Sequence, residues 1–166
     1  MIHAFDTYYQ KNKAKTAAIS FESWTDSKPK NSYSEITEIE SEYVSGEFYR
    51  RELPCIISLM KQMPFRESDI IVVDGFVILD DERHLGLGGY LYHELNEKFP
   101  VIGVAKRPFS KLDILKKEVF RGESKNPLYV TALGIDLEKA ASHISEMHGD
   151  YRMPTLLRIL DQLSRE

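Results

Sequence analysis

DIIVVDG, at residues 69–75, indicates the architecture of this chain. The run is short, is continuously apolar and β-branched over residues 70–73, and ends in Asp74 and Gly75. A strand with one face in water alternates apolar and polar residues, so an unbroken apolar run is typical of a strand covered on both faces. We therefore expect residues 69–75 to form a central strand of a sheet with helices on either side.

The segments before this central strand have the alternation of an antiparallel meander. Its expected strands are IHAFD at 2–6, TAAISFESW at 16–24 and SYSEITEIESEY at 32–43. The polar residues 11–15 and 27–31 are expected to form the turns between them. From Gly46 onward the apolar spacing becomes helical, and Pro54 fits that helix only if it lies near the first turn.

Helical and strand patterns alternate after the central strand. They predict a helix at 89–99, strands at 99–106 and 126–134, and helices at 135–147 and 153–165. This order predicts an α/β fold with the layout of the ribonuclease H-like fold. It is a mixed sheet of three antiparallel strands and then parallel strands, with helices on both faces. With 166 residues, the chain is expected to form a single domain over 1–166.

Composition excludes several classes of protein. The chain is 42% hydrophobic and 29% charged, as in soluble globular proteins, and its net charge of −4 argues against a generic polyanion binder. No segment approaches the ~20 apolar residues that span a bilayer, and the first residues have no secretory pattern. Cys55 has no second cysteine to pair with. We expect a cytoplasmic protein without a membrane partner, and a monomer.

Four carboxylates occupy positions that the apolar pattern places toward the interior. Asp6 ends the first strand and Asp74 ends the central one, so neighbouring strands would bring them to one sheet edge. Glu52 lies between apolar residues at four-residue spacing on its helix. Asp161 borders the leucine stripe of the last helix. Because unpaired buried charges are costly, these acids are candidates for a site.

Carboxylates from separate elements repel one another unless a cation joins them. Ligation by oxygen atoms alone suits Mg²⁺, with Mn²⁺ as a substitute, and no cysteine or histidine cluster suggests zinc. Such an ion lowers the pKa of bound water, as phosphodiester hydrolysis requires. The alternative is that each acid caps a helix, ends a strand or pairs with a neighbour such as Arg50 or Arg51.

Lys106 closes the VIGVAK strand at the same expected edge, where its charge would stabilise a phosphate in the transition state. A solvated lysine at a strand end is the plainer interpretation. Positive charge continues after it, since residues 106–125 hold seven Lys and Arg against three Asp and Glu. Arg107 and Lys111 in this segment are candidates for contacts with nucleic acid.

These residues occur in blocks that resemble the endonuclease V family. The blocks run in order through almost the whole chain as AFDTYY, YVSGEFYRRELP, DIIVVDGF, RHLGLGG, PVIGVAK, PLYVTALGI and YRMPTLLRILDQL. The resemblance implies a ribonuclease H-like fold and metal-binding catalytic acids at Asp6, Glu52 and Asp74. It also implies a catalytic lysine at Lys106, and it places Asp161 where relatives carry Asp or His.

The resemblance further implies an Mg²⁺-dependent endonuclease that acts on DNA or RNA. The family cuts 3′ to deaminated purines, chiefly inosine, and leaves 3′-hydroxyl and 5′-phosphate ends. The residues expected to contact nucleic acid are Tyr43, Gly75, Arg83, Gly86, Arg107 and Lys111. Relatives have a Pro-Tyr-Ile-Pro wedge where this chain reads Glu42, Tyr43, Val44 and Ser45, so only the aromatic residue of the wedge is kept.

Two alternatives keep the fold but change the function. One is a nuclease with the same metal site that acts on branched or flapped nucleic acid, because the lost wedge prolines concern selection of the substrate. The other is a module that binds nucleic acid without cutting it. A purely structural partner protein is the third and plainest possibility.

Overall fold

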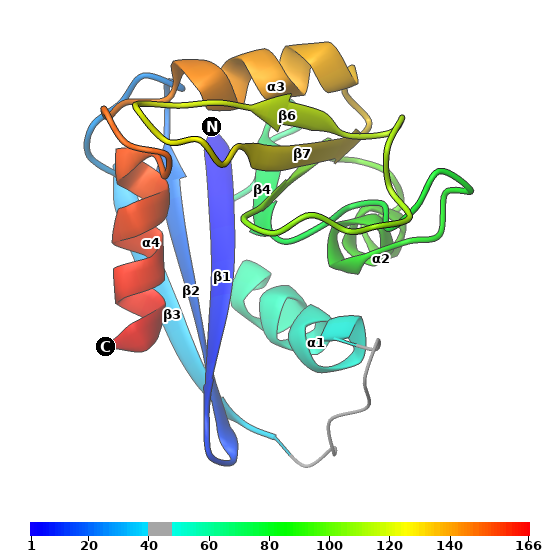
Figure 1. Ribbon diagram of the computed structural model, residues 1–166. Helices are drawn as coiled ribbons and strands as arrows, with labels where there is room; N and C mark the ends of the chain where they lie inside the picture. The colour runs from blue at the N-terminus through cyan, green and yellow to red at the C-terminus, as the bar shows by residue number, and fades with distance from the viewer. Residues whose placement is uncertain (40–47) are drawn as a thin grey trace.

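A computed structural model describes residues 1–39 and 48–166 of the chain. Its centre is a sheet of seven strands in the order β3-β2-β1-β4-β5-β7-β6 (Figure 1). The strands are β1 (Ile2–Gln10), β2 (Lys13–Phe21), β3 (Asn31–Glu38), β4 (Ile70–Asp74), β5 (Val101–Ala105), β6 (Lys117–Val119) and β7 (Leu128–Leu133). The helices are α1 (Phe48–Met60), α2 (Leu87–Glu94), α3 (Leu137–Glu146) and α4 (Thr155–Arg165). The α/β architecture with a mixed sheet is confirmed.

Strand directions match the expected order over most of the sheet. β1, β2 and β3 form the antiparallel meander, and β4 and β5 run parallel to β1. The expectation that parallel strands continue to the end of the sheet is wrong for β7, which runs antiparallel to β5. A parallel strand needs a crossover, usually a helix, to carry the chain back. No helix forms over residues 106–127, and the short β6 instead pairs antiparallel with β7.

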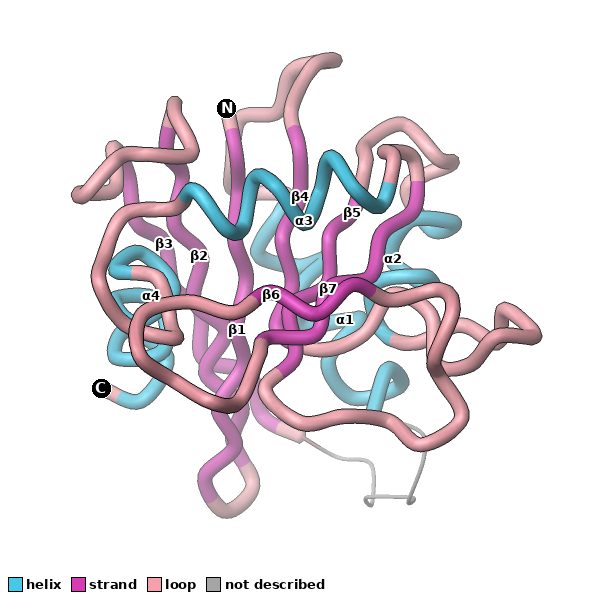
Figure 2. Tube along the Cα trace, turned by 45° about the horizontal axis from the view of Figure 1, so that its top comes forward, coloured by secondary structure: helices cyan, strands magenta, loops and turns pink. Residues whose placement is uncertain are grey.

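Helices cover both faces of the sheet (Figure 2). On one face, α3 and α4 bury Ile144, Leu156 and Leu160 against β1, β2 and β7. On the other face, α1 and α2 bury Leu59 and Leu91 against a second cluster. Both faces of β4 are therefore apolar, which is the reason that residues 70–73 do not alternate.

Helix α1 contains Pro54 in its interior, as the seventh residue that the structure assigns to it. The expectation that this proline lies near the first turn is therefore wrong. Proline has no N–H to donate and normally disturbs a helix interior. Here its ring faces solvent, while the neighbouring Cys55 and Ile56 are buried. Tertiary packing of the apolar face of α1 outweighs the local preference.

Over the two described parts of the chain, no helix has the length and apolar character needed to cross a membrane.

Candidate active site

The carboxylates of Asp6 and Asp74 lie next to each other at one edge of the sheet. In the parallel pairing of β1 and β4, Phe5 is level with Val73, so the residues that follow, Asp6 and Asp74, are level too. The expectation that the first strand ends at Asp6 is wrong, because β1 continues to Gln10 along its pairing with β2. Asp74 does end β4, and the two acids are brought together as expected.

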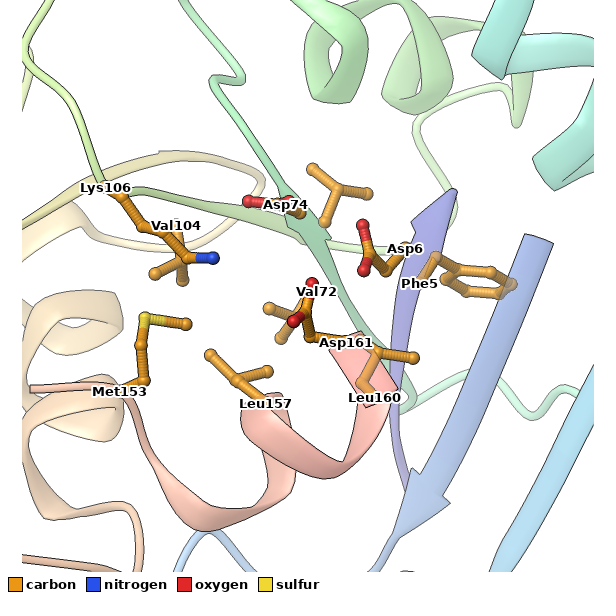
Figure 3. Close-up of a pocket in the computed structure, with 11 residues that line it drawn as sticks. Phe5, Asp6, Val72, Asp74, Val104, Lys106, Met153, Leu157, Leu160 and Asp161 are labelled. Atoms are coloured by element: carbon orange, nitrogen blue, oxygen red, sulfur yellow. The ribbon is translucent and has the colours of Figure 1, made fainter. Parts of the chain in front are cut away.

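Two further predicted residues reach the same place from other elements. Lys106 directly follows β5, whose Val104 is level with Asp74. Asp161 lies on α4, one turn after Leu157, and α4 packs against β1. Figure 3 shows the three carboxylates and the Lys106 ammonium around one space. They line a small cavity whose other walls are apolar.

The apolar walls of the cavity come from β1, β4, β5 and the last helix. Those labelled in Figure 3 are Phe5, Val72, Val104, Met153, Leu157 and Leu160. Asp74 and Lys106 reach solvent at the mouth of this cavity, while Asp6 is partly buried beside the apolar walls. Electrostatic interactions on the apolar side are stronger than in water.

Glu52 faces the acids from α1, on the opposite face of the sheet from α4. Burial raises the pKa of the Glu52 carboxyl to about 8, and the charges of Asp74 and Asp6 add to the effect. The nearby Arg51 guanidinium opposes this rise with a smaller effect, and it also lies 4.4 Å from the centre of the Tyr9 ring. Glu52 is therefore close enough to the two aspartates for their charges to repel its own, and its role as a metal ligand stays a prediction.

Asp6 and Asp74 behave as a pair. Burial raises the pKa of Asp6, and the charge of Asp74 raises it further. The side chain of Asp74 opens to solvent, but surrounding protein atoms remove part of its hydration and raise its pKa. The Lys106 ammonium lowers the pKa of Asp74. The hydrogen bond between the two carboxyls raises the pKa of Asp6 and lowers that of Asp74. The two carboxyls therefore titrate as a coupled pair, with both pKa values raised.

A serine that the sequence reasoning missed contacts this pair. The Ser164 hydroxyl lies 2.9 Å from Oδ2 of Asp6 and 2.9 Å from the backbone carbonyl of Asp161. Its side chain is only 1% exposed. The sequence gives only a weak signal for this residue. Ser164, three residues after Asp161, interrupts the apolar stripe of the last helix.

Asp161 has its own local partner. The Arg165 Nε lies 3.1 Å from both carboxylate oxygens of Asp161, one helical turn away. The Arg165 guanidinium also lies 4.7 Å from the centre of the Tyr8 ring. The alternative of local ion pairing, considered for each acid, is correct for Asp161. That pairing still leaves Asp161 among the residues that line the cavity.

The donor set fits a hard divalent cation. Oxygen donors approach from β1, β4, α1 and α4, and their mutual repulsion raises pKa values in a way that a cation would reverse. In the described parts of the chain, no three Asp, Glu, His or Cys side chains are already grouped closely enough to chelate a metal ion. Asp6 and Asp74 are the closest pair, so they would be the primary ligands. Glu52 and Asp161 would complete the carboxylate set.

Two glycines expected to contact nucleic acid have structural roles. Gly75 follows Asp74 with a φ of +125°, which other residues rarely adopt, so it lets the chain turn directly after the acid. Gly86 precedes α2, and a Cβ there would lie 2.4 Å from the Phe76 carbonyl oxygen. Close packing of α2 on the turn after β4 therefore explains Gly86. A contact of either glycine with nucleic acid stays a prediction.

The cationic candidates are exposed around the same edge. Arg83, Arg107 and Lys111 all have solvent-accessible side chains. Asp81 fastens their two loops together, because its carboxylate accepts hydrogen bonds from the backbone N–H groups of residues 113–115 at 2.9–3.2 Å. Tyr43 lies outside the described residues, so its wedge role stays a prediction.

Not every cation of the basic segment is available to a partner. Arg121 is buried and donates to backbone carbonyls of residues 147–152, and Lys117 lies 3.5 Å from Glu138. Lys116 lies 5.1 Å from the centre of the Tyr129 ring. Of the seven cations counted along residues 106–125, Lys106, Arg107 and Lys111 are exposed at the start of the segment and Lys125 at its end.

Several solved structures have the same fold. Endonuclease V of Ciona intestinalis, solved in complex with a 24mer DNA containing an inosine followed by a ribo-adenosine, superposes with a TM-score of 0.82. The match has 19% identity and covers 99% of this chain and 84% of that one. Endonuclease V of Streptomyces avermitilis gives a TM-score of 0.77 at 22% identity, over 99% of this chain and 79% of the other. At these identities the likeness establishes the fold.

Sequence comparison shows the family as well as the fold. Endonuclease V of Clostridium acetobutylicum is 30% identical over 147 residues, which cover 75% of this chain. The chain spans 61% of the length of that relative. The sequence model of the family described as Endonuclease V matches residues 1–129, which include Asp6, Glu52, Asp74 and Lys106. Because this match spans well over half of the 166 residues, the chain belongs to the endonuclease V family.

Proposed function

We propose that this protein is an Mg²⁺-dependent endonuclease, with Mn²⁺ as a substitute, that hydrolyses a phosphodiester bond in DNA or RNA. The observation that carries the proposal is the convergence of Asp6, Asp74, Asp161 and Lys106 on one cavity from four separate elements. Membership of the endonuclease V family supports the reaction class.

The preferred substrate in this proposal is a strand that contains a deaminated purine, chiefly inosine. The cut falls on its 3′ side and leaves 3′-hydroxyl and 5′-phosphate ends. The Ciona relative that shares the fold was solved with inosine-containing DNA, which supports this choice. We place Gly75, Arg83, Gly86, Arg107 and Lys111 near the bound strand because they surround the same sheet edge.

The residues have distinct roles in the proposed mechanism. A bound divalent ion would supply a water of lowered pKa and polarise the phosphoryl group. Asp6 and Asp74, supported by Glu52 and Asp161, would hold the ion. The Lys106 ammonium stabilises the negative charge that grows on the phosphate in the transition state. The apolar walls of the cavity lie beside the reacting phosphate, so electrostatic interactions on that side pass through a medium of low polarity.

The direct test is nicking of an inosine-containing strand in Mg²⁺ by the wild type and by Asp74→Asn, Asp6→Asn and Lys106→Ala proteins. We expect the aspartate variants to lose at least about a hundredfold in rate, since each removes a charged ligand. Glu146→Gln, on the exposed side of α3, is the matched control and should cut like the wild type. Equal cutting by wild type and Asp74→Asn proteins would refute the proposed site.

A substrate panel separates the related possibilities. Strands with inosine, undamaged duplexes, and branched or flapped duplexes are compared at one enzyme concentration. Preference for inosine supports the substrate proposed here. Faster cutting of branched duplexes would assign the same centre to deformed nucleic acid, and tight binding without cutting would make the protein a binding module.

A further inference from the structure

A second feature adjoins the acid site, at the loop of residues 147–154 between α3 and α4 (Figure 2). This loop is built around the buried guanidinium of Arg121. Arg121 Nη1 donates to the Tyr151 carbonyl at 2.6 Å, and Nη2 donates to the Met147 carbonyl at 2.5 Å. It also donates to the carbonyls of Gly149 and Arg152. Backbone carbonyls held by a buried cation give the loop a defined shape.

Two further contacts anchor the same loop. Arg152 donates to the Pro127 carbonyl at 2.7 Å and to the Lys106 carbonyl, so it ties the loop to the end of β5. Gly122 passes so close that a Cβ there would lie 2.3 Å from the Asp150 carbonyl oxygen. These contacts fix the position of the loop relative to Lys106.

The loop exposes an aromatic ring. Tyr151 is 67% exposed, although its backbone is held by Arg121. The guanidinium of Arg158, from the first turns of α4, lies 5.1 Å from the centre of the Tyr151 ring. An exposed aromatic surface beside a cation is the arrangement that binds successive nucleotides, because the ring stacks on a base and the cation neutralises a phosphate.

The hollows around these residues share lining residues with the acid site. Met153 borders the cavity of Asp6 and Asp74, and it also borders the broad hollow beside Tyr151. A smaller hollow between them is lined by Lys106, Asp161 and Arg158. We call this row of adjoining hollows, from the acids past Lys106 and Arg158 to the Tyr151 ring, the groove.

We propose that Tyr151 and Arg158 form a nucleotide subsite that binds the single strand where it leaves the acid site. This subsite, called here the Tyr151–Arg158 platform, stacks one base on the tyrosine ring and places the adjoining phosphate on the guanidinium. The proposal rests on the proposed nuclease function and adds where the strand continues beyond the bond that is cut. Asp150 and Glu123 border the outer part of the groove, so the platform holds the strand through stacking and one phosphate contact.

The platform is tested with the full chain and a fluorescein-labelled 12-nucleotide DNA strand that contains inosine, in EDTA so that no cutting occurs. Fluorescence anisotropy gives Kd for Tyr151→Ala, Tyr151→Phe and Arg158→Gln proteins. Tyr151→Ala should raise Kd about five- to hundredfold, the range for loss of one base–aromatic stack. Tyr151→Phe should stay within about twofold of the wild type. Arg158→Gln should raise Kd and lower the slope of log K against log salt by about 0.7, as for one phosphate contact on a single strand.

Matched controls remove an exposed aromatic and an exposed cation elsewhere. Phe120→Ala, at a side chain that is 59% exposed, and Lys139→Gln, on α3, should bind like the wild type. A strand with 2-aminopurine at successive positions adds a spectroscopic test, because stacking on Tyr151 quenches that base. The quench should occur at one position and disappear in Tyr151→Ala protein.

The outcomes distinguish the platform from the nuclease. If the wild type binds the strand and Tyr151→Ala protein binds it equally well, the platform is wrong, whatever the cutting assay shows. If Tyr151→Ala loses affinity while no protein cuts in Mg²⁺, the platform stands and the nuclease proposal fails. Failure of the wild type to bind any strand would overturn the platform.

Discussion

At the scale of single residues, the Ser164 hydroxyl has one proton to donate and two acceptor groups within reach. It lies 2.9 Å from both the Asp6 carboxylate and the Asp161 carbonyl, and it is buried. When Asp6 is ionised, donation to its Oδ2 orients the carboxylate and leaves Oδ1 for a cation. Ser164 is therefore a positioning residue for the primary pair of acids.

Ser164→Ala is expected to weaken Mn²⁺ binding by about fivefold, because loss of one hydrogen bond to a buried group costs about 1 kcal/mol. Isothermal titration calorimetry with Mn²⁺ measures this without any cutting. Ser142→Ala, an exposed serine on α3, is the control. Unchanged Mn²⁺ affinity in Ser164→Ala protein would show that Asp6 is oriented by other contacts.

Glu52 makes the stability of the metal-free protein depend on pH. Burial raises its pKa from 4.5 to about 8, so the folded protein keeps a proton that the unfolded chain releases above pH 4.5. The stability from this group is fully present below pH 4.5 and is lost as pH rises through 8. Urea unfolding in EDTA at pH 6 and 9 should show wild type losing more free energy of unfolding than Glu52→Gln protein. Equal losses would contradict the raised pKa.

At the scale of elements, the turn after β4 is packed directly against β5. A Cβ on Gly103 of β5 would lie 2.5 Å from the Gly75 carbonyl oxygen and 2.8 Å from Thr131 Oγ1. The same Thr131 oxygen accepts the Val77 N–H at 2.9 Å. Contacts this close hold the chain that follows Asp74 in one position.

Gly103→Ala is therefore expected to lower the free energy of unfolding by about 1–3 kcal/mol, the usual cost of overpacking a core. Mn²⁺ affinity should fall as well, since the turn next to Asp74 must move. Thermal and urea unfolding measure the first effect and calorimetry the second. Ser145→Ala, a small change on the exposed side of α3, should alter neither. Wild-type stability in Gly103→Ala protein would be inconsistent with this packing.

At the scale of the whole molecule, the acid site contains residues from near both ends of the chain. Asp6 lies in the first strand and Asp161 in the last helix, so a shared cation would tie together elements separated by most of the sequence. A cation that binds only the folded state stabilises it in proportion to the logarithm of its concentration.

Saturation with Mg²⁺ at about 100 times Kd is expected to raise the free energy of unfolding by about 2.7 kcal/mol. EDTA should reverse the gain, and Asp6→Asn and Asp74→Asn proteins should show little of it. The measurement is the midpoint of thermal unfolding at several Mg²⁺ concentrations, at a pH above 8 where the carboxyls are ionised. A midpoint that does not respond to Mg²⁺ in wild type would argue against a metal site.

Local patterns were sufficient for much of this molecule. The unbroken apolar run at 70–73 and the alternating strands before it predicted a mixed sheet. The order of apolar and polar residues along a strand indicates whether one face or both faces are buried. The acids at Asp6 and Asp74 were conspicuous for the same reason, since each follows a mainly apolar run, although β1 continues beyond Asp6 to Gln10. The reversal of β7 and the interior position of Pro54 were missed, because both depend on how distant segments pack.

What only the folded chain decided is which distant groups meet. The register of β1 and β4 makes Asp6 and Asp74 level, and α4 brings Asp161 and Ser164 to them. Likewise, the burial of Arg121 under a loop about 30 residues away removes one cation from the basic segment and exposes Tyr151 beside Arg158. Side-chain order along a strand or helix reveals which face is buried. Contacts between such faces follow from three-dimensional packing, which no local pattern contains.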